Sequence, residues 1–142
     1  MKNLNQKIQH LLNLFKSKNF IDAEILVKET IEKYPNNAFL YNFLGLVLSK
    51  LRRNDEAVKI YKKGIKIDKN FSMFYNNLGI IYQSRKEHQK AKNFYERAAK
   101  LGKKFSEAHN NLGNLYRILN KNKKAIFSFK KAIDINPSFF PG

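Results

Sequence analysis

The stretches YNNLGIIY at residues 75–82 and HNNLGNLY at residues 109–116 share one pattern and lie thirty-four residues apart. Both carry asparagine and glycine, which cost about 0.5 and 1 kcal/mol relative to alanine inside a helix. Both nevertheless place apolar residues at helical spacing, i, i+3, i+4 and i+7. A fixed period of this length is the sequence signature of stacked structural repeats. The two stretches therefore predict a repeat protein, in which packing between helices offsets the weak helix propensity.

The same period extends through most of the chain. A Leu-Gly pair recurs at Gly45, Gly79 and Gly113, and an alanine follows each glycine by twelve residues. Leu11 stands in the glycine position of a degenerate first copy. The sequence thus divides into four units, residues 4–37, 38–71, 72–105 and 106–139.

Each unit is predicted to form two helices. Helical periodicity stops at a polar break, such as residues 52–55 or 120–122, and then resumes. Pro35 and Pro137 follow the second helices of units one and four, where a helix should end. No segment shows strand alternation. A glycine in mid-helix that faces an alanine of the next helix would allow close backbone approach.

This arrangement of residues resembles the tetratricopeptide repeat, whose pattern is W-x2-L-G-x2-Y, then A-x3-F, then P. Unit four matches best, with His109, Leu112, Gly113, Tyr116, Ala125, Phe129, Ala132 and Pro137. The chain departs from the pattern in its other units, at Lys69 and Lys103, which replace the terminal proline, and at His10-Leu11, which replaces Leu-Gly. The resemblance implies an all-α solenoid of four helix-turn-helix repeats, with about eight helices in a right-handed superhelix. It also implies a single domain over residues 1–142 that acts as a protein-binding scaffold, with the first helices lining a concave groove.

The first helices of units two to four are rich in asparagine, whereas the second helices have only Asn93 in a mid-helix position. Amide side chains both donate and accept hydrogen bonds, so a row of them can hold the backbone of an extended segment. The row resembles the asparagine ladder in the tetratricopeptide superhelix of O-GlcNAc transferases. We therefore expect a peptide-binding groove that contains Asn42, Asn76, Asn77, Asn110, Asn111, Asn114, Lys50 and Arg117. Two alternatives are that the asparagines link neighbouring helices, or that they reflect low-GC coding.

The formal net charge of +17, from 28 basic and 11 acidic residues, favours an acidic partner. Lysines crowd the second helices and would form a basic outer surface. A protein or peptide partner is the first expectation, and nucleic acid or an anionic membrane is the alternative for this surface.

The sequence does not predict an enzyme. His10, His88 and His109 lie in different units at different positions, and cysteine is absent. We expect no catalytic residues, no metal site and no cofactor. With neither a signal-peptide pattern nor an apolar stretch of spanning length, the expected location is the cytoplasm.

Unit four ends in NPSFFPG, without a further helix to cover the apolar side of its second helix at Ile126 and Ile133. A repeat array usually carries a polar cap at its ends. Three explanations stay open. The chain could be the recognition module of a larger glycosyl- or sulfotransferase, it could self-associate through this end, or the tail could fold back over it.

Overall fold

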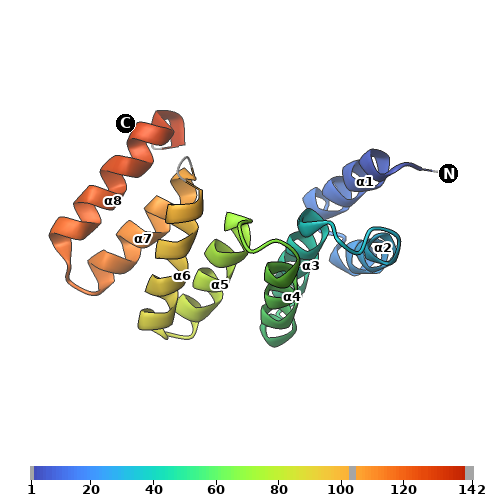
Figure 1. The fold of residues 1–142 in the computed structure, drawn as a ribbon, viewed down its shortest axis with the longest axis horizontal. Coiled ribbons are helices and arrows are strands. Elements are labelled where there is room, and N and C mark those ends of the chain that lie inside the picture. The colour runs from blue at the N-terminus through green and yellow to red at the C-terminus, as the bar shows by residue number, and fades with distance from the viewer. Residues whose placement is uncertain (1, 103–104, 140–142) are drawn as a thin grey trace. The chain divides into compact units, whose positions relative to one another are not determined.

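The computed structural model describes residues 2–102 and 105–139, and its regular secondary structure over these residues consists of helices (Figure 1). Eight α-helices are followed by a short 3-10 helix at Pro137–Phe139. The first helices of the units begin thirty-four residues apart, and so do the second helices, which confirms the predicted all-α repeat fold. In chain order they are α1 (Leu4–Lys16), α2 (Phe20–Lys33), α3 (Ala38–Lys50), α4 (Asn54–Ile67), α5 (Ser72–Ser84), α6 (His88–Leu101), α7 (Ser106–Ile118) and α8 (Asn122–Ile135).

The chain divides by its internal contacts into two compact units, which meet between Lys69 and Asn70. In the first unit, α1 packs on α2, α2 on α3, and α3 on α4. In the second unit, α5 packs on α6, α6 on α7, and α7 on α8, while α5 also touches α7. Each of these two compact units therefore contains two complete helix pairs. The single domain expected over residues 1–142 stays a prediction.

Aromatic rings explain the glycines of the Leu-Gly pairs. A Cβ atom built on Gly79 would lie 2.6 Å from Cδ1 of Tyr95, and one built on Gly113 would lie 2.7 Å from Cε1 of Phe129. Gly45 meets the ring of Tyr61 in the same way. The atoms nearest to these glycines thus belong to a ring of the second helix, and not to the alanine that the sequence suggested. Any side chain at these positions would displace the facing aromatic ring.

A residue in the left-handed conformation follows the first helix of each of the four repeats. Lys18, Arg52, Lys86 and Asn120 have φ values of 61°, 63°, 60° and 59°. In the second repeat, the amide of Arg52 donates to the carbonyl of Ser49 at 3.0 Å, and the amide of Arg53 donates to the carbonyl of Leu48 at 2.8 Å. This pair of bonds is the Schellman motif, which usually has glycine at the left-handed position. The polar breaks seen in the sequence are therefore tight C-caps.

Side-chain caps begin two of the first helices. Asn3 accepts a hydrogen bond from the Gln6 amide at 2.8 Å, and the Gln6 side chain accepts one from the Asn3 amide at 3.0 Å. This reciprocal capping box starts α1. Asn37 accepts from the Leu40 amide at 3.2 Å and starts α3.

Two features of the chain's ends were anticipated from the sequence. Ile126 and Ile133 of α8 are 55% and 43% exposed, as expected for an uncovered helix side. Lys103, which stands in the place of the terminal proline of the repeat pattern, and the tail residues 140–142 lie outside the described residues. In the part of the chain that the structure describes, no helix combines the length and apolar character needed to cross a membrane.

Candidate functional site

The predicted groove residues are distributed over both compact units. Asn42 and Lys50 belong to α3 of the first unit, whereas all the others belong to α5 and α7 of the second. The second unit therefore holds the larger part of the candidate site, on two helices that touch one another. Its members are Asn76, Asn77, Asn110, Asn111, Asn114 and Arg117.

One pair of these asparagines links successive repeats. Nδ2 of Asn111 donates a hydrogen bond to Oδ1 of Asn76 at 3.1 Å, from α7 to α5. Asn76 is 1% exposed, so its amide is removed from solvent. A polar group buried this deeply needs a partner, and the bond supplies one. This contact is of the kind expected from the alternative that the asparagines link neighbouring helices.

Burial separates the predicted residues into two groups. Asn42 is 2% exposed and Asn77 is 9% exposed, so both resemble Asn76. The three asparagines of α7 are partly accessible, and the two basic residues of the set are exposed. The accessible residues are Asn110, Asn111, Asn114, Lys50 and Arg117.

The accessible polar residues of α7 share one side of that helix. Asn110, Asn114 and Arg117 are spaced i, i+4 and i+7, which places their side chains in one row. Ile118 continues the row and is 49% exposed. The row presents two amides, a guanidinium and an apolar side chain to solvent.

The neighbouring helix α5 adds exposed apolar surface. Met73 and Ile80 are 37% and 42% exposed, and their i, i+7 spacing puts them on one side of α5. Gln83, near the end of α5, accepts a hydrogen bond from the Tyr95 hydroxyl at 2.7 Å. Its carbonyl oxygen therefore helps to hold α6 against α5. We call the accessible set Met73, Ile80, Asn110, Asn111, Asn114, Arg117 and Ile118 the amide face.

The histidines do not form a catalytic arrangement in the described part of the chain. His10, His88 and His109 lie on α1, α6 and α7. Burial, followed by the charge of Lys131, lowers the pKa of His109 below its ordinary value of 6.5, so its ring is neutral at pH 7. Within residues 2–102 and 105–139, no three histidine, aspartate or glutamate side chains lie close enough together to hold a metal ion.

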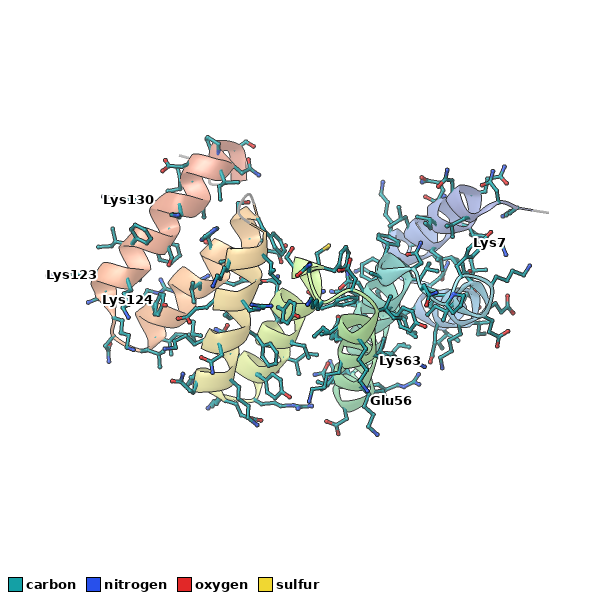
Figure 2. The ribbon with its side chains drawn as sticks, in the orientation of Figure 1. Lys7, Glu56, Lys63, Lys123, Lys124 and Lys130 are labelled. Carbon is teal, nitrogen blue, oxygen red and sulfur yellow. The ribbon has the colours of Figure 1, made fainter. Side chains whose placement is uncertain are left out.

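Lysines cover the second helices, as the sequence indicated. Four of them lie on α8, and Figure 2 labels three of these, Lys123, Lys124 and Lys130. The fourth is Lys131, and all four side chains are exposed. Among the described residues, none of the four forms an ion pair with a carboxylate. The positive charge of α8 is therefore open to a partner.

Comparison with known proteins agrees with the helical repeat geometry. Sequence profiles of the tetratricopeptide repeat match residues 40–71, 60–93 and 106–139. These matches together extend over more than half of the chain, which belongs to the tetratricopeptide repeat family.

Several solved structures share the fold. The crystal structure of MamA is 24% identical, with a TM-score of 0.75 over 98% of this chain and 78% of that chain. PilF of Pseudomonas aeruginosa is 22% identical, with a TM-score of 0.83 over 94% of this chain and 61% of that chain. YrrB, described as a tetratricopeptide repeat protein with an unusual peptide-binding site, is 19% identical, with a TM-score of 0.70 over 94% and 69%. At such identities the likeness is one of fold, and no curated protein sequence matches this one significantly.

Proposed function

We propose that this chain is a protein-binding scaffold that holds an extended polypeptide segment against the amide face of its second unit. The observation that carries the proposal is the row of Asn110, Asn114 and Arg117, which is accessible on one side of α7, a helix that touches α5 with its exposed Ile80. Its family consists chiefly of protein-binding scaffolds, and YrrB is itself described as having a peptide-binding site.

The chemistry of the row suits a peptide backbone. Each amide side chain has an oxygen acceptor and an NH2 donor, so two amides one helical turn apart can bond to backbone carbonyl and N–H groups of an extended segment. Such contacts give affinity without reading the segment's sequence. Met73, Ile80 and Ile118 would contact its apolar side chains, and Arg117 would pair with a carboxylate.

The buried asparagines take a different part in this proposal. Asn76 would act through Asn111, because their hydrogen bond fixes the position of α7 relative to α5. Asn42 and Asn77 are too deeply buried to be direct contacts. The resemblance to the asparagine ladder of O-GlcNAc transferases would then apply to the accessible amides of α7.

Peptide selection tests the proposal. The immobilised chain is used to select binders from a phage-displayed library of random peptides, and dissociation constants of the selected synthetic peptides are measured by fluorescence anisotropy. We expect the double variant Asn110→Ala/Asn114→Ala to bind about tenfold more weakly, since each lost hydrogen bond costs about 0.5–1.5 kcal/mol. Asn93→Ala on α6 is the matched control, because Asn93 is also an exposed mid-helix asparagine of this unit.

A chemical change in the peptide gives a second criterion. Methylating the backbone nitrogens of a selected peptide removes its N–H donors, so binding should weaken as it does in the double variant. If the double variant binds the selected peptides as tightly as the unmodified chain, or if N-methylation has no effect, the amide face is not the binding site.

A further inference from the structure

The third repeat contains an aromatic cluster between its two helices. Phe94 of α6 stacks on Tyr82 of α5, with ring centroids 5.4 Å apart and planes inclined by 8°. Its centroid lies 6.5 Å from that of Tyr75. Nζ of Lys90 lies 5.4 Å from the Tyr82 ring centroid, and Cζ of Arg97 lies 5.7 Å from that of Tyr75. In this repeat the ring of Phe94 fills the space between the helices, and cations cover the tyrosines.

The fourth repeat retains this frame but lacks the central ring. Thirty-four residues after Phe94 the chain has Ser128, which is 3% exposed. The tyrosines are matched by His109 and Tyr116, and the cations by Lys124 and Lys131. The smaller side chain leaves an open hollow of about 430 Å³ between α7 and α8. We call it the Ser128 hollow, and its lining includes His109, Leu112, Tyr116, Lys124, Ser128 and Lys131.

The hollow combines an apolar floor with a basic rim. Nζ of Lys124 lies 5.7 Å from the Tyr116 ring centroid, and Nζ of Lys131 lies 5.5 Å from the ring centroid of Phe127. The Phe127 ring is 64% exposed at the edge of the hollow. The Tyr116 hydroxyl donates to Oε1 of Glu96 at 2.8 Å, and neither Lys124 nor Lys131 forms an ion pair with a carboxylate of the described residues. The rim lysines therefore stay available to an incoming negative charge.

We propose that the Ser128 hollow is a second binding site, which takes an aromatic side chain from an acidic segment of a partner protein. The occupant's ring would lie where Phe94 lies in the third repeat, and neighbouring carboxylates would pair with Lys124 and Lys131. This site uses α7 and α8, and it is independent of Asn110 and Asn114. Charge complementarity selects the partner, since the rim is basic and the chain carries a net charge of +17.

Two other occupants fit the hollow less well. A second copy of the chain would bring another strongly basic surface against the lysines of α8. A nucleobase could stack, but the polar edge that faces the apolar side chain of Leu112 would lose its hydrogen bonds to water without replacement. A phenyl ring has no such requirement.

The test uses two synthetic peptides that differ at one residue. Both carry the same number of acidic residues, with phenylalanine at the centre of one and alanine at the centre of the other. Fluorescence anisotropy with the full chain should show about tenfold or tighter binding for the phenylalanine peptide, as expected for burial of an aromatic side chain.

The variant Ser128→Phe fills the hollow with the residue that the third repeat already accommodates. We expect it to fold, as checked by circular dichroism, and to bind the two peptides with equal, weak affinity. Lys124→Gln/Lys131→Gln should weaken both peptides by the same factor and keep the difference between them. Discrimination that persists in Ser128→Phe would overturn the proposal.

Two further measurements keep the test decisive. A peptide with p-benzoylphenylalanine at its centre should cross-link on irradiation to residues lining the hollow, and cross-links confined to other surfaces would contradict the assignment. Binding of single-stranded RNA of equal charge tests for a nucleobase as the occupant. Sedimentation of the free chain tests for a second copy of the chain. Either of two results would overturn the proposal: RNA that binds more tightly than the peptide, or a dimer of the free chain. In each case the decisive sign is that Ser128→Phe abolishes the RNA binding or the dimer.

Discussion

Asn111 of α7 donates a hydrogen bond to Asn76 of α5, with 3.1 Å between Nδ2 and Oδ1, and this bond ties the first helices of two successive repeats together. The first asparagine of the repeated NNLG tetrapeptide has a different environment in each of the two copies. Asn76 is buried where it meets α7 of the next repeat, whereas its counterpart Asn110 is partly accessible. The two copies of the tetrapeptide therefore differ in burial although their sequences are identical.

The bond between Asn76 and Asn111 should be measurable as a coupling free energy. In a double-mutant cycle with Asn76→Ala and Asn111→Ala, we expect a coupling of about 0.5–1.5 kcal/mol in the free energy of unfolding. Urea denaturation followed by circular dichroism supplies the measurement. The pair Asn110→Ala and Asn93→Ala, which share no contact in the structure, is the control and should be additive. A coupling near zero for Asn76 and Asn111 would show that the bond contributes nothing.

Gly79→Ala should destabilise the second unit by about 1–3 kcal/mol, because the added methyl group would lie 2.6 Å from the Tyr95 ring. The ring cannot easily move, since it is 2% exposed and its hydroxyl donates to Gln83. Thermal unfolding compares the variant with the unmodified chain. In a Tyr95→Leu background the same glycine substitution should cost less, and an equal cost in both backgrounds would argue against a clash with the ring.

Arg52→Gly should stabilise the first unit by about 0.5–1 kcal/mol. Arg52 has a φ of 63°, a conformation that is unfavourable for a residue with a Cβ atom and natural for glycine. Lys62→Gly, at an exposed interior position of α4, is the matched control and should destabilise by about 1 kcal/mol. Urea unfolding curves that shift in the same direction for both variants would refute the role of the left-handed cap.

Glu24→Gln should lower stability by about 1 kcal/mol at neutral pH and have little effect in acid. Glu24 accepts hydrogen bonds from Arg53 and Lys28 at 2.7 Å each, and the bond from Arg53 is the main cause of its lowered pKa. The folded state therefore favours the carboxylate. Its contribution is fully present above the ordinary value of 4.5 and is lost as the pH falls through the lower folded pKa. Unfolding free energies of both chains between pH 7 and pH 3 provide the check, and a difference that does not shrink in acid would contradict this assignment.

The fold was predictable because its signal is repeated. A thirty-four-residue spacing of Gly45, Gly79 and Gly113 leaves few alternatives to stacked helix pairs, and every helix pair was located in this way. The partner of each glycine was not predictable, because the alanine and the aromatic residue of the second helix both occur at constant spacing. Only coordinates show that the ring of Tyr95 or Phe129 is the nearer group.

The candidate site was predictable only as a set of residue types. Asparagine in the first helices indicated amide chemistry, but sequence spacing does not tell which side chains the next repeat covers. The Ser128 hollow was missed, although its signal is present in the sequence. Aligning the units shows Ile60 and Phe94 at the position where the fourth unit has serine, and a missing large residue at a repeated position indicates a space.

By itself, the sequence determined the four repeat units, the two helices in each and the basic charge, because these depend on local propensity and on residues at constant spacing within one chain. Tertiary structure alone decided that Asn76 is buried while Asn110 and Asn114 are accessible, and that the substitution at Ser128 leaves an open hollow. Burial is a property of what packs over a residue, and that depends on neighbours far away in the chain.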